Sequence, residues 1–170
     1  MDFIELVRAR YSVRAYKPDP VEPEKLEQVL EAARLAPTAD NRQAFQVLVV
    51  RTAGREKELK RIYHREFFRQ APLVVAVCGI PSQNWVRKED GKNYSDVDAA
   101  IVMDHLILAA ADLGLGTCWV AAFDVAAARE VLRLPAGVEL VALTPLGYPA
   151  DLPGPKKRKK LSELVRYDHW

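Results

Sequence analysis

Residues 95–113 read SDVDAAIVMDHLILAAADL, a long helical pattern that decides the expected architecture. Apolar side chains fall on nearly every side of this predicted helix, so it should be buried on all sides. Its start resembles a capping box, with Asp98 in the place of the usual Glu or Gln, and Gly114 follows its end. A chain of this size cannot readily enclose such a helix alone, which favours a homodimer built around it. A central helix wrapped by its own sheet is the alternative interpretation.

Four apolar runs predict strands around this helix, and amphipathic segments between them predict further helices. The expected strands are 45–51, 73–78, 117–122 and 138–147, and the expected helices begin near Asp2, Pro23, Glu56 and Asp124. The polar stretch 82–94 is expected to be a loop. No internal repeat or linker divides the sequence, so residues 1–170 predict a single domain of the α/β or α+β class.

Composition narrows the function classes. Apolar residues make up 49% and charged residues 28% of the chain, which is typical of a soluble globular protein. The net charge of +2 does not indicate a nucleic-acid partner, and no apolar run reaches the roughly 20 residues of a membrane span. We expect no signal peptide, since the N-terminal segment is a charged helix. Cys78 and Cys118 are expected to be buried free thiols in a reducing cytoplasm, and the histidines lack metal-ligand spacing, so no metal site is expected.

A basic motif follows the first predicted helix, with the sequence RARYSVR at residues 8–14. Arg10, Ser12 and Arg14 alternate, so they share one side of an extended segment. Guanidinium groups grip oxyanions in bidentate fashion, which makes this side suitable for a phosphate. The alternative is a solvated helix end whose cations offset the helix dipole.

A second polar cluster, PTADNRQ at residues 37–43, precedes the first predicted strand. Its hydroxyl and amide groups can donate and accept hydrogen bonds, as the edge of a flat heterocycle requires. The alternative is a simple polar turn, because Asn and Asp are common turn residues.

The motifs of the chain, and the order in which they occur, resemble those of the nitroreductase-like flavoprotein family. The matching segments are 10–14, 36–43, 98–101 with 106–111, 114–119, 146–149 and the basic tail. The resemblance covers nearly the whole chain. It implies an α+β fold with a central, mainly antiparallel sheet flanked by helices, a domain-swapped homodimer, and two FMN molecules at the dimer interface.

The resemblance also implies which positions bind the cofactor. The N-terminal motif and the basic tail would hold the FMN phosphate and ribityl chain. Loop 37–43 would approach the flavin ring from the other subunit, and residues 119–120 would also approach the cofactor. These positions are Arg10, Tyr11, Ser12, Arg14, Pro37, Thr38, Asn41, Gln43, Trp119, Val120, Lys156 and Arg158. The run 155–160 also resembles a nuclear localisation signal, and basic runs often form plain solvated surface.

The function that the resemblance implies is an FMN-dependent NAD(P)H oxidoreductase. NADH or NADPH would reduce the flavin at N5, and the reduced flavin would pass electrons to a small organic acceptor, nitroaromatic- or quinone-like, by ping-pong exchange. The flavin carries this chemistry, so no catalytic side chain is expected. The alternative is a non-catalytic flavin-binding or sensory module with the same fold. The physiological acceptor, the pathway and the choice between NADH and NADPH do not follow from a family resemblance. Segment 80–94 is where a substrate lid would lie in the resembling proteins, and its Trp85 has two open interpretations: it stacks on a substrate or the flavin, or it covers the core.

Overall fold

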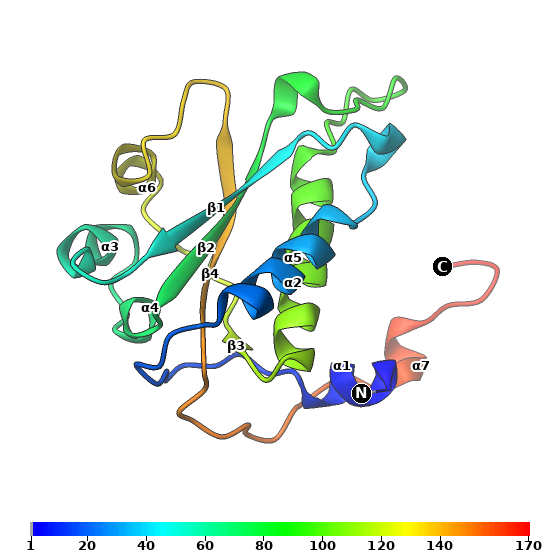
Figure 1. Cartoon of the computed structure of the whole chain (residues 1–170). Helices are drawn as coiled ribbons and strands as arrows, with labels where there is room; N and C mark the ends of the chain where they lie inside the picture. Colours follow the sequence, from blue (N-terminus) through cyan, green and yellow to red (C-terminus); the bar gives the residue numbers. More distant parts are fainter. Residues whose placement is uncertain (1) are drawn as a thin grey trace.

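The computed structural model describes residues 2–170 and is built on one four-stranded sheet (Figure 1). The strands are β1 (Phe45–Arg51), β2 (Leu73–Gly79), β3 (Gly116–Thr117) and β4 (Glu139–Gly147), in the spatial order β1-β2-β4-β3. All three neighbouring pairs run antiparallel, with Val47 opposite Val77 and Val75 opposite Thr144. The expected mainly antiparallel α+β architecture is therefore confirmed.

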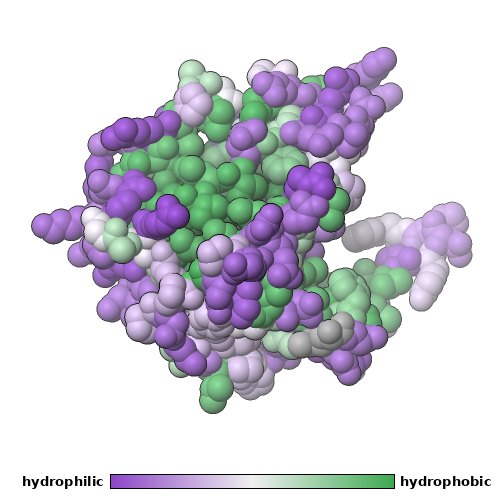
Figure 2. Space-filling model, viewed as in Figure 1, coloured by the Kyte–Doolittle hydropathy of each residue, from purple (hydrophilic) through white to green (hydrophobic). Residues whose placement is uncertain are grey.

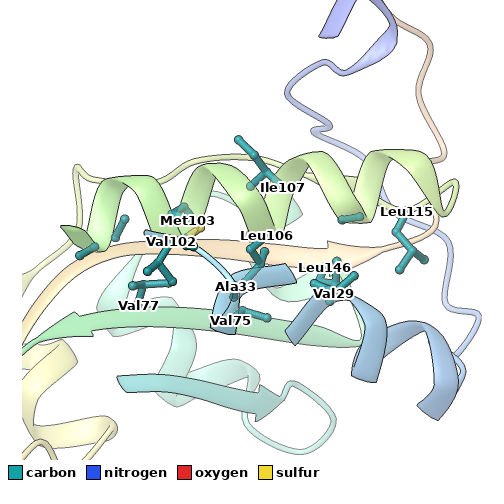
Figure 3. Packing of buried hydrophobic residues seen from close by; sticks show 14 of the residues in the cluster. Val29, Ala33, Val75, Val77, Val102, Met103, Leu106, Ile107, Leu115 and Leu146 are labelled. Carbon is teal, nitrogen blue, oxygen red and sulfur yellow. The ribbon is translucent and has the colours of Figure 1, made fainter. Parts of the chain in front are cut away.

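Helices cover both faces of the sheet, which explains why β2 is apolar and buried along its whole length. On one face lie α2 (Pro23–Arg34) and α5 (Ser95–Asp112), and on the other lie α3 (Glu56–Ile62), α4 (Phe67–Gln70) and α6 (Val125–Val131) (Figure 1). Two hydrophobic clusters result, one on each side of the sheet. Figure 3 shows the first, where Val102 and Leu106 of α5 lie over Val75 and Val77 of β2, and Val29 of α2 closes the cluster.

The predicted helix starts are confirmed where local chemistry sets them. Asp2 caps α1 (Phe3–Ala9), since its carboxylate accepts a 2.8 Å hydrogen bond from the backbone N–H of Ile4. Asp124 caps α6 in the same way, through a 2.8 Å bond from the N–H of Ala127. Pro23 occupies the first position of α2, where its missing N–H costs no hydrogen bond.

Two local predictions are wrong. The strand expected at 117–122 is reduced to β3 and an isolated bridge at Val120, because the N–H of Cys118 donates to the side-chain Oγ1 of Thr144 at 2.9 Å and so interrupts the backbone ladder between them. The capping box expected at the start of α5 does not form either. Tyr94 is the N-cap residue, and the N–H of Ser95 donates to Oδ1 of Asn93 at 2.9 Å. The carboxylate of Asp98 is engaged elsewhere, as described below.

Only one side of α5 is enclosed by its own chain. Leu106 and Val102 are buried against the sheet, whereas Ala100, Ile101 and His105 on the opposite side stay partly exposed. A shallow hollow of about 490 Å³ lies over this opposite side. The described residues therefore leave part of the apolar surface of α5 uncovered.

The chain ends leave the body of the fold. After β4, residues 153–158 return to the end of α1, and α7 (Leu161–Leu164) and the tail extend outward (Figure 1). Exposed apolar side chains gather on both terminal segments: Phe3, Ile4, Val7, Leu161, Leu164, Tyr167 and Trp170. No helix among residues 2–170 combines the length and the apolar character that crossing a membrane would require.

Candidate cofactor-binding site

The N-terminal motif lies flat against the short strand β3. The N–H of Val13 donates to the carbonyl oxygen of Thr117 at 2.9 Å, and Ser12 forms a parallel bridge with the same residue. The close approach depends on Gly116, because a Cβ there would stand 2.6 Å from Cγ2 of Val13. Residues 10–14 are therefore extended, as their alternating pattern predicts.

Asp151 joins the C-terminal segment to this motif. Its Oδ2 accepts a 2.8 Å hydrogen bond from the backbone N–H of Arg14, and the hydroxyl of Tyr11 donates to its carbonyl oxygen at 2.8 Å. Burial, and then the nearby charge of Asp151, raise the pKa of the Tyr11 hydroxyl. Asp151 thereby brings the basic tail across Arg10. No local sequence pattern predicts this role, because the partners of Asp151 lie 137 and 140 positions away.

A pocket of about 280 Å³ forms where the two chain ends meet. Its lining includes all six residues expected at the phosphate end of the cofactor: Arg10, Tyr11, Ser12, Arg14, Lys156 and Arg158. The structure therefore brings these residues together although the first and last are far apart in sequence. Their contact with a phosphate stays a prediction.

Positive charge is concentrated in this pocket, because three guanidinium groups and two ammonium groups line it. Burial, followed by the charges of Arg10 and Arg158, lowers the pKa of the Lys156 ammonium. Among residues 2–170, no ion pair involves Arg10, Arg14, Lys156 or Arg158. Like charges held together at one site favour the binding of an oxyanion, and guanidinium groups match a phosphate in shape. The donor set of the pocket fits the phosphate of FMN.

The second predicted cluster forms a tight loop around the turn η1 (Ala39–Asn41). Asp40, Asn41 and Gln43 adopt left-handed backbone conformations, with φ of 53°, 50° and 51°. Oγ1 of Thr38 accepts a 3.0 Å hydrogen bond from the N–H of Gln43, which closes the loop.

Side chains at the tip of this loop also pair with each other. Asp40 forms a 2.9 Å ion pair with Arg42, and Nε2 of Gln43 donates to Oδ1 of Asn41 at 3.3 Å. Asn41 and Gln43 are both exposed. Among the hydrogen bonds of residues 2–170, none uses the side-chain N–H₂ of Asn41, so it can donate to a ligand.

The pocket and the loop lie at opposite ends of α5. Ala111 and Gly114, at the C-terminal end of the helix, line a cavity that adjoins Arg10, whereas the loop touches Asp98 near the N-terminal end. A helix of 18 residues is ~27 Å long. One chain therefore does not bring Pro37, Thr38, Asn41 and Gln43 to the phosphate pocket.

Trp119 and Val120 are placed differently from each other. The side chain of Trp119 is 39% exposed, whereas that of Val120 is 3% exposed and packs in the second core cluster. The N–H and carbonyl of Val120 both pair with Leu143, at 2.8 and 3.0 Å. Trp119 is thus the one of the two whose side chain reaches the surface.

Trp85 packs against a side chain of its own segment, residues 80–94. Its ring packs edge-on against Tyr94 of the same segment, with centroids 5.0 Å apart. Tyr94 in turn accepts a 2.9 Å hydrogen bond from Nη1 of Arg87. Trp85 therefore contributes to the internal packing of this segment.

Comparisons with known proteins show the family and the fold of this chain. The profile of the Nitroreductase family matches residues 7–65 and 60–148. A nitroreductase family protein of Clostridium difficile has the same fold over the full length of both chains, with 38% identity and a TM-score of 0.92.

Two relatives carry names that describe an activity. A protein of Methanothermobacter thermautotrophicus, named provisionally as an NADH dehydrogenase/NAD(P)H nitroreductase, is 28% identical over 91% of this chain and 81% of its own. The FMN reductase [NAD(P)H] of Bacillus subtilis is 29% identical over 86% of this chain and 66% of its own. The profile match covers most of the chain, and the full-length structural match accompanies it, so the chain belongs to the nitroreductase family.

Proposed function

We propose that this protein is an FMN-dependent oxidoreductase that takes electrons from NADH or NADPH and passes them to a small organic acceptor, nitroaromatic- or quinone-like, by ping-pong exchange. The observation that carries the proposal is the pocket that gathers Arg10, Arg14, Lys156 and Arg158, whose side chains form no ion pair within residues 2–170. The relatives named FMN reductase [NAD(P)H] and NAD(P)H nitroreductase support the cofactor and the electron donor.

Residues of the chain would bind and orient the cofactor. The cationic pocket would hold its phosphate, with the hydroxyl of Ser12 as a further donor. FMN, when bound, supplies two-electron transfer between the nicotinamide and the acceptor, so the protein needs no general acid or base of its own. Asn41 would donate its free amide to the carbonyl edge of the ring and stabilise negative charge there.

The separation of pocket and loop along α5 supports a homodimer. A two-fold axis perpendicular to α5 at its midpoint sets two copies of the helix antiparallel, so the N-terminal end of one lies near the C-terminal end of the other. Loop 37–43 of one subunit would then approach the phosphate pocket of its partner. The partly exposed face with Ala100, Ile101 and His105 would form the centre of the interface.

The outward tail supports a domain-swapped form of this dimer. Residues 161–170 carry the exposed apolar side chains Leu161, Leu164 and Trp170, which a single chain leaves uncovered. Strand β1 lies at one edge of the sheet, and beside it Leu48 and Val50 line an open pocket of about 680 Å³ that charged side chains, among them Arg55, Arg61 and Glu130, also line. Figure 2 shows an exposed hydrophobic area on this side of the molecule, bordered by hydrophilic side chains. The tail of the partner would cover this edge and protect it from unwanted strand pairing.

The proposed compartment is the cytoplasm, because Cys78 and Cys118 are free, buried thiols.

The absorption spectrum of the purified protein tests the proposed function. We expect a yellow protein whose flavin bands bleach when NADH or NADPH is added without oxygen and return when a quinone or nitroaromatic compound follows. A colourless protein that does not bind added FMN would overturn the proposal and favour the non-catalytic module. A yellow protein that neither nicotinamide bleaches would overturn the assignment of the electron donor.

A further inference from the structure

Asp98 is a buried carboxylate that connects two loops at the N-terminal end of α5. Asp98 is only 2% exposed. Oδ1 accepts a 3.0 Å hydrogen bond from the backbone N–H of Ala39, and Oδ2 accepts a 3.1 Å bond from Nδ2 of Asn84. Asn84 is itself 8% exposed and accepts a 2.6 Å bond from the N–H of Trp85 through its Oδ1.

Each polar group in this chain of contacts has a fixed direction. The N–H of Ala39 and the N–H of Trp85 can only donate, and the amide of Asn84 uses its oxygen for Trp85 and its nitrogen for Asp98. Residue 98 must therefore accept two hydrogen bonds on two different oxygens. A carboxylate does this, and an amide in its place cannot do so without leaving one donor unpaired.

Asp98 has no cationic partner among the ion pairs of residues 2–170. A buried carboxylate is unfavourable unless N–H donors compensate for the lost hydration, and here the first turn of α5 adds its dipole to the two donors. A capping role would have placed this carboxylate on the start of its own helix, yet it faces Ala39 and Asn84 instead.

The loop held by Asp98 has an unfavourable backbone. Ala39 directly precedes Asp40, and three of the next four residues, Asp40, Asn41 and Gln43, are left-handed without being glycine. Such conformations persist only where the surroundings enforce them. Within the loop, Thr38 Oγ1 supplies one restraint through Gln43, and Asp98 supplies the restraint that comes from the body of the protein.

We propose that Asp98 is a positioning residue that holds loop 38–43 in its left-handed shape, so that the Asn41 amide is presented to the flavin ring; the second half of this statement rests on the proposed function. Asp98 acts through the loop and touches neither cofactor nor substrate. Through Asn84, the same carboxylate ties the loop to segment 84–94, so both segments share one anchor.

A swap of two side chains tests the anchor. In Asp98→Asn, one oxygen still accepts from Ala39, but the new N–H₂ meets the N–H₂ of Asn84, and flipping Asn84 leaves the N–H of Trp85 unpaired. Adding Asn84→Asp restores every pairing: Asn at 98 accepts from Ala39 and donates to Asp at 84, which still accepts from Trp85. The double variant also keeps the net charge. If Asp98 only filled space, adding Asn84→Asp would not restore the properties lost in Asp98→Asn.

The first readout needs no flavin. In protein freed of FMN, trypsin cleavage after Arg42 reports opening of the loop, since Arg42 is exposed at its tip. We expect cleavage in Asp98→Asn to be at least tenfold faster than in the wild type, and cleavage in the double variant to be within threefold of the wild type. Equal rates in Asp98→Asn and the wild type, or an unrescued double variant, would overturn the anchor.

The second readout concerns the flavin. We expect Asp98→Asn to change the ratio of the dissociation constants for oxidised and reduced FMN about tenfold, which corresponds to ~30 mV in the potential, and the double variant to reverse this change. Thr52→Val is the matched control, because it removes the buried 2.6 Å hydrogen bond from Thr52 to the carbonyl of Ala71, away from the loop. It should lower the melting temperature with no change in the ratio or in cleavage after Arg42.

The two proposals can fail separately. A wild-type protein that does not bind FMN overturns the proposed function and the flavin half of the inference, while the cleavage rates still decide the anchor. A flavin-binding wild type in which Asp98→Asn loosens the loop with an unchanged potential overturns the positioning role and leaves the proposed function standing.

Discussion

Nζ of Lys156 donates a 3.3 Å hydrogen bond to the main-chain carbonyl oxygen of Val7, although 149 positions separate the two residues. It also donates to the carbonyl oxygen of Arg8, so the ammonium provides hydrogen bonds to carbonyl oxygens in the last turn of α1, which have no partner within the helix. Lys156 thereby fixes the basic tail against the N-terminal motif. One of its three N–H donors stays available for a ligand in the pocket.

The binding of FMN should weaken in alkaline solution because of Lys156. In the free protein, burial and then the charges of Arg10 and Arg158 hold the pKa of Lys156 below its ordinary value of 10.5. A bound phosphate favours the charged ammonium and raises this pKa. Affinity is therefore greatest below the pKa of the free protein and falls as the pH rises from there towards the pKa of the complex.

Titration of FMN fluorescence at several pH values above about 8, where the phosphate is already a dianion, measures this effect. Lys156→Arg is the control, since arginine stays charged throughout this range and should give a flat profile. An identical slope in the wild type and in Lys156→Arg would contradict the role of Lys156.

Removal of Arg14 should weaken FMN binding by roughly 1.5–3 kcal/mol, the scale of a hydrogen bond between charged groups. Arg14 lines the pocket, and its Nη1 makes a 3.3 Å contact with the carbonyl oxygen of Ser12. Calorimetric titration of FMN into the flavin-free Arg14→Ala variant gives the value directly. Arg65→Ala, at an exposed position that does not line the pocket, should bind as the wild type does. Equal affinities for both variants would remove Arg14 from the phosphate site.

A bulky charge on the open face of α5 should break the dimer. Ala100 lines the hollow on this face together with Val97, Ile101 and the flanking Asp96 and Asp104, so Ala100→Arg places a long, charged side chain where two copies of α5 are expected to pack. We expect light scattering at micromolar concentration to show a dimer for the wild type and a monomer with little bound FMN for the variant. Ala126→Arg, on the exposed side of α6, is the matched control and should stay dimeric. A wild-type monomer that holds FMN would refute the α5 interface.

Asn41→Ala should shift the potential of bound FMN to more negative values, on the order of 30 mV or more. The reason is that a lost donor at the ring no longer stabilises the charge of the reduced flavin. Equilibration with a reference dye measures the shift. The ion pair between Asp40 and Arg42 holds the tip of the loop, and the amide of Asn41 accepts from Gln43, so a purely structural role is the competing interpretation. That role predicts a lower melting temperature with an unchanged potential.

The sequence was sufficient for features that depend on near neighbours. The span of β1 follows from its apolar run, and the starts of α1 and α6 follow from Asp2 and Asp124, because a cap bonds a backbone N–H two or three residues away. The alternation of Arg10, Ser12 and Arg14 likewise predicted an extended segment with one cationic side.

The meeting of Arg10 with Lys156 and Arg158 came from the family resemblance, since no local pattern relates one chain end to the other. The role of Asp151, which holds the C-terminal segment against the N-terminal motif, was not predicted from the sequence. Its two partners are Tyr11 and the N–H of Arg14, and only the folded chain brings them within reach.

Asp98 shows most clearly where sequence reasoning stops. The spacing from Ser95 suggested a cap for its own helix, and the apolar pattern around it correctly gave the long helix α5. The partner of its carboxylate was decided by packing, because a buried acceptor bonds whichever donors the fold delivers, and here these are Ala39, 59 positions away, and Asn84, 14 positions away. The sequence by itself determined most of the helical and extended segments, through periodicity and short-range hydrogen bonds; the tertiary structure decided where the strand after α5 is interrupted and which polar groups face one another, because those contacts join residues that only the folded chain places together.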